Sequence, residues 1–197
     1  MRLVAFGCSN TYGFALPQEN NGDKLPLTSK YAWPAVLSNR LGVECVNKGI
    51  PGASNKLISH MISNTPLYST DIVVVLWSYI DRWCVIENLK YNEHNPAINY
   101  SIAPWISDKR SKYYYKLIYN ETDHQLDTNY RIDYTNLYLN NKGIKHYQSS
   151  CGSIDHPLLF DIKFQELKNI DYAADNQHAG IKAHKAIAET FYKRITQ

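Results

Sequence analysis

The sequence lacks the long apolar segments that mark a membrane protein or a secreted precursor. None of its 197 residues belongs to an apolar run near the roughly 18 residues that a membrane-spanning helix needs. The apolar stretch that follows Met1 ends at Gly7, which makes it too short for the core of a signal peptide. We therefore expect a protein that stays in the cytoplasm and has no membrane partner.

Cysteine and histidine occur without the spacing that a metal site or a disulfide framework requires. The four cysteines form no C-x-x-C pair and stand far apart, at Cys8, Cys45, Cys84 and Cys151. The seven histidines show no H-x-x-x-H or H-E-x-x-H pattern. We expect free thiols in this compartment, no metal and no cofactor.

An excess of charge of one sign is also missing. Lysine and arginine number 21 against 18 aspartates and glutamates, a net charge of +3 that is too small to indicate a nucleic-acid partner. With 44% hydrophobic and 20% charged residues, the chain has the composition of a folded protein, and its length fits one domain. Tyrosine is abundant, with 16 residues, and its apolar ring and polar tip suit surfaces and cleft walls. No feature of the sequence indicates an oligomeric state.

The first part of the chain alternates between strand and helix patterns. The run at 72–76 is Ile-Val-Val-Val-Leu, which is typical of a strand buried on both faces in a parallel sheet. Apolar spacing predicts strands at 3–6, 43–46 and 71–77 and helices at 31–41 and 55–62. This order predicts an α/β domain of three layers, with helices on both faces of a central parallel sheet.

The middle of the chain is less regular and rich in tyrosine, asparagine and charge. We predict helices near 108–119 and 128–141, a helix stop followed by a strand within 143–147, and a last helix at 180–195. The whole chain, 1–197, is then a single domain with an aromatic-rich cap or insertion at about 83–142. The basic and aromatic run at 109–116 fits either a solvated helix face or a contact with a sugar or phosphate.

Three polar segments stand where an α/β fold places its sites. Ser9 follows the first strand, in the sequence Gly-Cys-Ser-Asn-Thr-Tyr-Gly, and Gly49 and Gly52 follow the second strand. Asp175 stands three residues before His178, where its carboxylate could orient the imidazole toward a nucleophile. Each segment also has a structural explanation, because glycine and serine are common in turns and aspartate often caps a helix.

Taken together, these segments resemble the SGNH (GDSL-type) hydrolase family over residues 3–82 and 171–195. The resemblance implies a flavodoxin-like α/β/α sandwich that hydrolyses esters and acyl groups without a metal. It also implies that Ser9 is the nucleophile, that His178 is general base and then acid, and that Asp175 orients it. The backbone N–H groups of Ser9 and Gly52 would form the oxyanion hole. His184, in the last helix, fits packing better than catalysis.

The sequence departs from the family pattern at two positions. Cys8 replaces the usual aspartate before the serine, and Cys8 is itself an alternative nucleophile, although nothing places it beside the base. Ser78 replaces the asparagine that gives the third oxyanion hydrogen bond in the family. Ser78, Asn55 or Arg82 could supply that bond, and Asn10 is a further candidate contact to substrate or oxyanion. SGNH-like proteins encoded by bacteriophages resemble the chain in these departures.

The leading hypothesis from the sequence is a serine esterase acting on a small-molecule or carbohydrate ester, for example an O-acetyl group. The alternative is a catalytically weak or inactive protein of the same fold that binds a ligand or serves as a structural or host-interaction protein of a phage. The two hypotheses differ in whether Ser9 is activated, and this depends on the oxyanion hole that Ser78 leaves in question.

Overall fold

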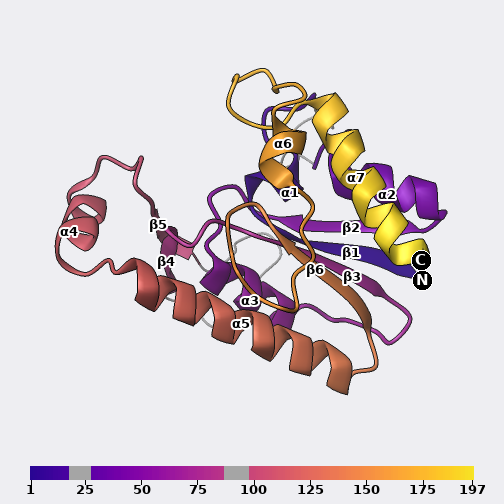
Figure 1. Ribbon diagram of the computed structural model, residues 1–197, viewed down its shortest axis with the longest axis horizontal. Coiled ribbons are helices and arrows are strands. Elements are labelled where there is room, and N and C mark those ends of the chain that lie inside the picture. Colours follow the sequence, from indigo (N-terminus) through magenta and orange to yellow (C-terminus); the bar gives the residue numbers. More distant parts are fainter. Residues whose placement is uncertain (18–27, 87–97) are drawn as a thin grey trace.

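A central parallel sheet organises the protein (Figure 1), whose computed structural model describes residues 1–17, 28–86 and 98–197. The sheet has the strand order β2-β1-β3-β6, and all its neighbouring strands are parallel. Its strands are β1 (Arg2–Gly7), β2 (Glu44–Gly49), β3 (Ile72–Trp77) and β6 (Lys145–Ser150). The predicted parallel sheet is thereby confirmed.

The two central strands are the most apolar because both of their faces are covered. All residues of β3 are buried, and so are all residues of β1 after Arg2. The outer strands β2 and β6 keep several half-exposed residues. The continuous β-branched run of β3 therefore follows from its central position, as expected for a parallel sheet.

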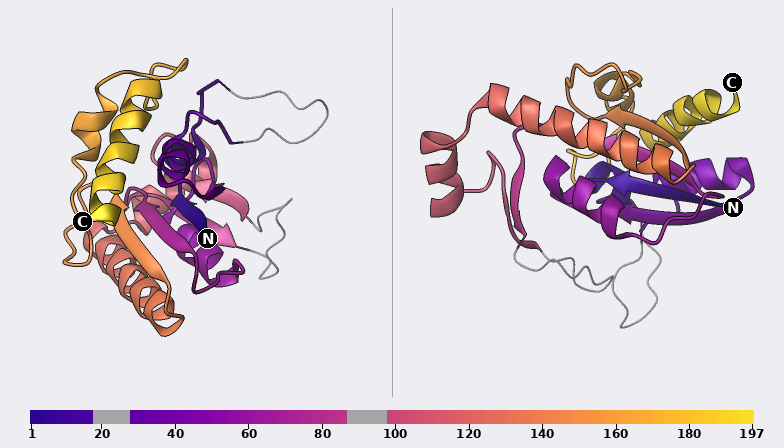
Figure 2. Two further views of the ribbon diagram at one scale, coloured as in Figure 1. Left: turned by 90° about the vertical axis from the view of Figure 1, so that its right-hand side faces the viewer. Right: turned by 90° about the horizontal axis from the view of Figure 1, so that it is seen from below.

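Helices cover both faces of this sheet (Figure 2). One face carries α2 (Trp33–Leu41), α6 (Phe164–Lys168) and α7 (Ile181–Thr196), and the other carries α3 (Asn55–Asn64) and α5 (Glu121–Asn141). The arrangement is the α/β/α sandwich that the alternation of strands and helices predicts. Among the described residues, no helix is both long enough and apolar enough to cross a membrane.

A buried contact joins α2 to α7. The rings of Trp33 and Phe191 stack with their centroids 4.8 Å apart. The backbone N–H of Trp33 donates to Nδ1 of His184 at 2.9 Å, so this imidazole has a structural role, as the sequence suggested. Burial lowers the pKa of His184 to about 4, because the charged imidazolium loses its hydration there.

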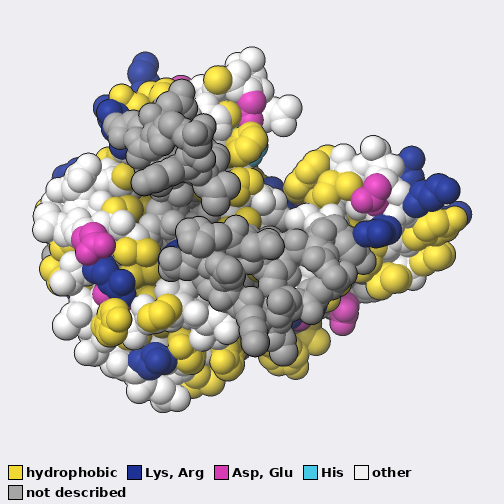
Figure 3. Space-filling model, turned by 180° about the vertical axis from the view of Figure 1, so that it is seen from behind, with side chains coloured by type: hydrophobic (Ala, Val, Ile, Leu, Met, Phe, Trp, Pro, Cys, Tyr) yellow, Lys and Arg dark blue, Asp and Glu magenta, His cyan; other side chains and the backbone are white. Residues whose placement is uncertain are grey.

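The segment 83–142 divides into a part that projects and a part that belongs to the sandwich. The antiparallel pair β4 (Trp83–Ile86) and β5 (Ile98–Ile102) contacts α3 and gives Cys84 to the main hydrophobic core, whereas α4 (Lys109–Leu117), which follows, projects. Basic and hydrophobic side chains gather on the lobe that carries α4 (Figure 3). By contrast, α5 contributes Ile132 and Leu139 to the main hydrophobic core. Residues 87–97, including His94, lie outside the described residues.

Several elements begin elsewhere than the sequence pattern indicates. Helix α5 starts at Glu121 rather than 128, because the side chain of Asn120 caps it by accepting from the N–H of Asp123 at 3.0 Å. Gly143 ends the helix as predicted, with a φ of 65°, and the strand that follows it runs over Lys145–Ser150, three residues further than the sequence pattern indicates. The short helices α1 (Ser9–Tyr12) and α6 carry too few residues for a periodic signal.

Candidate active site

The candidate site lies at the carboxyl edge of the sheet. Gly7 at the end of β1 pairs with Gly49 of β2, and Trp77 at the end of β3 pairs with Ser150 of β6. Because all these strands are parallel, the loops that follow them meet at one edge. A cavity of about 330 Å³ opens there, and its lining includes the predicted residues Ser9, Asn10, Gly52, Arg82 and His178.

Ser9 is presented by a sharp turn from β1 into α1. It is the first residue of α1, after Cys8, whose backbone is extended and whose carbonyl accepts from the N–H of Thr11 and Tyr12. The turn is packed against β2, since a Cβ atom on Gly49 would lie 2.3 Å from the backbone nitrogen of Tyr12. Only glycine allows this approach, which explains the glycine at this position.

Asn47 fastens the same turn to β2. Its Nδ2 donates to the carbonyl of Thr11 at 2.8 Å, and its Oδ1 accepts from the N–H of Gly49 at 2.9 Å. The Asn-x-Gly segment therefore holds the helix that carries Ser9. The sequence pattern explains the glycines of this segment by a turn or a close approach to a ligand and indicates no role for Asn47.

Ser9, His178 and Asp175 form a continuous chain of hydrogen bonds. Nε2 of His178 lies 3.0 Å from Oγ of Ser9, and Nδ1 of His178 lies 2.5 Å from Oδ2 of Asp175. The ring of Phe14 packs against the imidazole with the ring centroids 5.0 Å apart. The imidazole is therefore held on one side by a carboxylate and on one face by an aromatic ring, with its other nitrogen on the serine hydroxyl.

Asp175 is fixed by its own backbone neighbours. Its Oδ1 accepts from the N–H groups of Gln177 and His178, each at 3.0 Å. Burial alone would raise the pKa of Asp175, but these two hydrogen bonds and the imidazole lower it to about 2. Its other carboxylate oxygen remains available to the imidazole ring. Asp175 is thus ionised over the whole physiological pH range.

The helix-cap explanation for Asp175 is wrong, because another aspartate serves α7. The side chain of Asp171 accepts from the N–H of Lys182 at 3.0 Å and from the N–H of Ala183 at 2.7 Å. Gly180 is the residue before the helix and makes no side-chain cap. Asp175 lies further upstream, in the turn that carries the imidazole.

Gly52 reaches the cavity with a backbone conformation that favours glycine. Its φ is +76°, and a Cβ atom at this position would come within 3.5 Å of Oγ of Ser101. The turn is set by the N–H of Ile50, which donates to the carbonyl of Gly7 at 3.0 Å. Gly52 and Ser9 therefore line the same cavity from adjacent strands.

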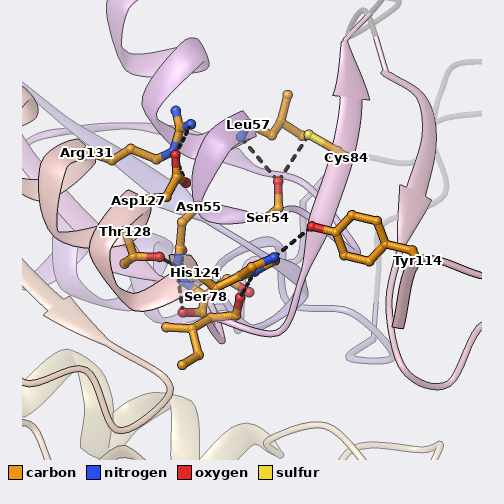
Figure 4. A network of polar contacts seen from close by, with 11 residues as sticks. Ser54, Asn55, Leu57, Ser78, Cys84, Tyr114, His124, Asp127, Thr128 and Arg131 are labelled. Carbon is orange, nitrogen blue, oxygen red and sulfur yellow. Dashed lines mark hydrogen bonds and ion pairs between the residues drawn. The ribbon is translucent and has the colours of Figure 1, made fainter. Parts of the chain in front are cut away.

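The structure does not bring Ser78 to this cavity. The residue is fully buried, is not part of the cavity lining, and its Oγ has no hydrogen-bond partner. Its N–H donates to Oδ1 of Asn55 at 2.7 Å, and its carbonyl accepts from Nδ2 of Asn55 at 3.2 Å (Figure 4). Neither Ser78 nor Asn55 therefore offers a hydrogen bond to a ligand here, in contrast to the role considered for them from the sequence.

Asn10 and the cysteines lie behind Ser9. Asn10 lines the cavity, and its Nδ2 is 3.9 Å from the sulfur atoms of both Cys8 and Cys151. Cys8 is completely buried and does not line the cavity, so the alternative in which it attacks the substrate has no support from its position. A hydrogen bond from Cys151 lowers the pKa of Cys8, and burial raises the pKa of Cys151.

Arg82 is in the cavity, and it is accompanied by residues that the sequence did not single out. The unpredicted lining residues are Phe14, Pro51, Tyr79, Trp105, Lys168 and Gln177. They come from loops and from α6, where no periodicity or motif marks a residue as facing a site. The sequence run at 109–116, which was considered as a ligand contact, lies on α4 and does not line this cavity.

A second cavity of about 500 Å³ lies along the loop that follows β6. It is lined by residues between Ser150 and Glu166 and includes neither Ser9 nor His178. Although it is larger, the hydrogen-bonded serine and histidine lie only in the smaller cavity. The smaller cavity is therefore the candidate site.

Comparisons with known proteins support the fold. No model of a protein family and no curated protein matches the sequence, whereas ten chains of solved structures match the fold. One is described as a lipolytic protein of the G-D-S-L family from Desulfitobacterium hafniense DCB-2, with a TM-score of 0.51, 12% identity and 98% of each chain covered. Another is the acetyl xylan esterase Est2A from the rumen bacterium Butyrivibrio proteoclasticus, with a TM-score of 0.57, 10% identity, and coverage of 98% of this chain and 63% of the esterase. The chain therefore has an SGNH hydrolase-like α/β fold.

Proposed function

We propose that the protein is a serine hydrolase that cleaves an ester or O-acyl group. The observation that carries the proposal is the hydrogen-bonded chain from Asp175 through His178 to Ser9, at 2.5 Å and 3.0 Å, inside a cavity. Similar geometry activates the serine of acyl-transfer enzymes on unrelated folds. The folds of the lipolytic protein and of the acetyl xylan esterase named above are consistent with this proposal.

In the proposed reaction, Oγ of Ser9 attacks the carbonyl carbon of the ester while Nε2 of His178 takes the hydroxyl proton. The bond to the alcohol oxygen then breaks, and the same nitrogen returns the proton to the leaving alcohol. A water molecule repeats the sequence on the acyl-serine, which releases the acid and restores Ser9. The ionised Asp175 stabilises the imidazolium that forms in each step.

The negative charge on the carbonyl oxygen needs hydrogen-bond donors in the transition state. We assign this role to the backbone N–H groups of Ser9 and Gly52, whose residues line the cavity together. Asn10 is the side-chain amide nearest in sequence to the nucleophile that also lines the cavity. We propose it as a contact to the substrate or to the oxyanion.

The size of the cavity favours a small acyl group. About 330 Å³ is at the lower end of the range of small-molecule sites, roughly 300–1,000 Å³. The rings of Phe14 and Trp105 offer apolar surfaces, and each is substantially exposed. A short ester, such as an O-acetyl group on a carbohydrate or small molecule, fits these dimensions.

A second candidate is a protein that binds a ligand at this cavity without efficient turnover, as a structural or host-interaction protein of a bacteriophage would. The burial of Ser78 favours it, because Ser78 stands at the position of the third oxyanion donor in SGNH hydrolases. Loss of one such donor typically lowers kcat by about 10² to 10³.

Labelling with a fluorophosphonate separates the two candidates, because this probe reacts only with an activated serine. We expect Ser9 to be labelled, and Ser9→Ala to abolish both labelling and turnover of p-nitrophenyl acetate. Cys8→Ala is the matched control, since it changes the neighbouring buried residue and leaves Oγ of Ser9 in place. Labelling that persists in Ser9→Ala would contradict the proposal, and an unlabelled, well-folded protein would favour the binding protein.

A further inference from the structure

Arg82 is held rigidly in the wall of the candidate site. It follows β3, and its guanidinium carbon lies 4.8 Å from the ring centroid of Tyr79 and 4.7 Å from that of Trp105. All three residues line the cavity with Ser9 and His178. Contacts with two aromatic rings fix the plane of a guanidinium group while leaving its edges free for hydrogen bonds.

Two nitrogen atoms of this half-buried side chain lack hydrogen-bond partners. Its Nε and Nη1 atoms are buried and have no hydrogen-bond partner. No ion pair within the described ranges joins Arg82 to a carboxylate, including the neighbouring Asp81, one of whose oxygens is also buried without a partner. Leaving buried charged donors unpaired costs free energy, so a structure that retains them is suited to a ligand that pairs with them.

The charge of the cavity points to an anion as that ligand. Lys168, at the end of α6, lines the cavity together with Arg82, and no aspartate or glutamate belongs to the described lining. Tyr79 does not neutralise the cations, since burial raises the pKa of its phenol to about 12. Seen from behind, the molecule is hollowed between the lobe that carries α4 and the rest of the protein (Figure 3).

We propose that Arg82 and Lys168 form a subsite for an anionic oxygen group of the substrate, a carboxylate or a phosphate, beside the ester bond at Ser9. This inference rests on the proposed hydrolase function and narrows its substrates to esters that carry a negative charge. A carboxylate or phosphate has several oxygens and can accept two parallel hydrogen bonds from one edge of the guanidinium group.

Ligand binding without turnover tests the subsite independently of catalysis. The test uses Ser9→Ala, which retains the cavity, titrated with glutarate and, separately, with inorganic phosphate by isothermal calorimetry. We expect saturable binding of at least one anion, and a loss of about tenfold to a hundredfold in affinity when Arg82→Gln is added. The anion that binds more tightly identifies whether the natural group is a carboxylate or a phosphate. Arg194→Gln is the matched control, because it removes the same charge from an exposed position on α7 that does not line the cavity.

Kinetics on two matched esters test the role in substrate choice. We compare kcat/KM for p-nitrophenyl hydrogen glutarate with that for p-nitrophenyl valerate, each corrected for spontaneous hydrolysis. We expect the ratio of charged to neutral ester to fall about tenfold or more in Arg82→Gln and to stay unchanged in Arg194→Gln. Arg82→Lys, which keeps the charge but loses the planar fork, should give an intermediate ratio.

The outcomes separate this inference from the proposed function. Anion binding that depends on Arg82, without any Ser9-dependent turnover, supports the subsite and overturns only the hydrolase proposal. Anion binding that is indifferent to Arg82 in two folded variants, Arg82→Gln and Arg82→Lys, overturns the subsite. So does an equal loss of kcat on both esters, because Arg82 would then stabilise the oxyanion rather than a charged group of the substrate.

Discussion

Asn55 holds the backbone of Ser78 from both sides, accepting from its N–H at 2.7 Å and donating to its carbonyl at 3.2 Å. The same amide nitrogen also lies 3.3 Å from Oγ1 of Thr128 in α5 (Figure 4). This side chain therefore ties the end of β3 to α3 and α5. The loop that follows β3 carries Tyr79 and Arg82 into the candidate site, so its position depends on Asn55.

We expect Asn55→Leu to destabilise the protein by roughly 1–3 kcal/mol, because it leaves two buried backbone groups of Ser78 without partners. Urea unfolding measures this loss. Ser78→Ala is the matched control: it removes only the buried hydroxyl, keeps both backbone bonds and should change stability and turnover little. If both variants lost the same free energy of unfolding, the stabilisation would come from the buried hydroxyl of Ser78 and not from the hydrogen bonds to its backbone.

Gly49→Ala should displace the helix that carries the proposed nucleophile. The added Cβ atom would stand 2.3 Å from the backbone nitrogen of Tyr12, and a backbone atom cannot move aside as a flexible side chain can. Overpacking of this kind costs about 1–3 kcal/mol, and we expect turnover to fall with it. Gly42→Ala is the control for backbone strain without a clash, since Gly42 has a φ of +68° but no atom within 4 Å of the added Cβ. Unimpaired turnover in Gly49→Ala would show that α1 does not depend on this contact.

Asp175→Asn tests the orientation of the imidazole. The amide keeps the size of the side chain but removes the charge that faces Nδ1 of His178, and we expect kcat to fall by roughly 10³ to 10⁴. The pKa of Asp175 is about 2, so its carboxylate stays ionised in neutral and mildly acidic solution, and protonation of Asp175 should not limit activity in that part of the pH profile. A profile that Asp175→Asn leaves unchanged in height would argue against the triad.

His184 should make the fold less stable in mildly acidic solution. Its pKa is about 4 in the folded protein, below the ordinary value of 6.5, so the unfolded chain binds the proton more tightly. The contribution of His184 to the free energy of unfolding is therefore fully present above about pH 6.5. It falls by about 3 kcal/mol as the pH drops to about 4. Denaturant unfolding at pH 7 and pH 4.5 measures the effect. In His184→Gln, which does not titrate, the difference between the two pH values should shrink, and an unchanged difference would assign it to other groups.

The fold could be predicted because its signals are periodic. The buried run of β3 and the helical spacing in α2, α3 and α7 lie in segments long enough to show a pattern. The antiparallel pair β4 and β5 gave no such signal, since its strands are short. Asp171 was not predicted as the cap of α7, because the chain between Asp171 and Lys182 folds back through a bridge between Tyr172 and Ala179.

The site was only partly predictable, for a related reason. The spacing of Asp175 and His178, together with a serine after the first strand, placed three side chains that the structure holds within hydrogen-bonding distance of one another. Ser78 was considered as a donor from its alignment with a motif, but the alignment could not indicate which way a single side chain turns at a strand end. Trp105 and Lys168 reach the cavity from loops and a short helix that only the three-dimensional fold brings together.

The hydrogen bond between His178 and Ser9 joins residues that are 169 positions apart in the chain. During synthesis, Ser9 is therefore made long before His178, the proposed base that would activate it. His178 stands just ahead of α7, which packs on α2 through the contact between Trp33 and His184. Hydrolysis at Ser9 would thus act as a reporter of completed folding. A chain that is cut before its last helix, or whose last helix is detached, would not hydrolyse the ester, even where the parallel sheet is still formed.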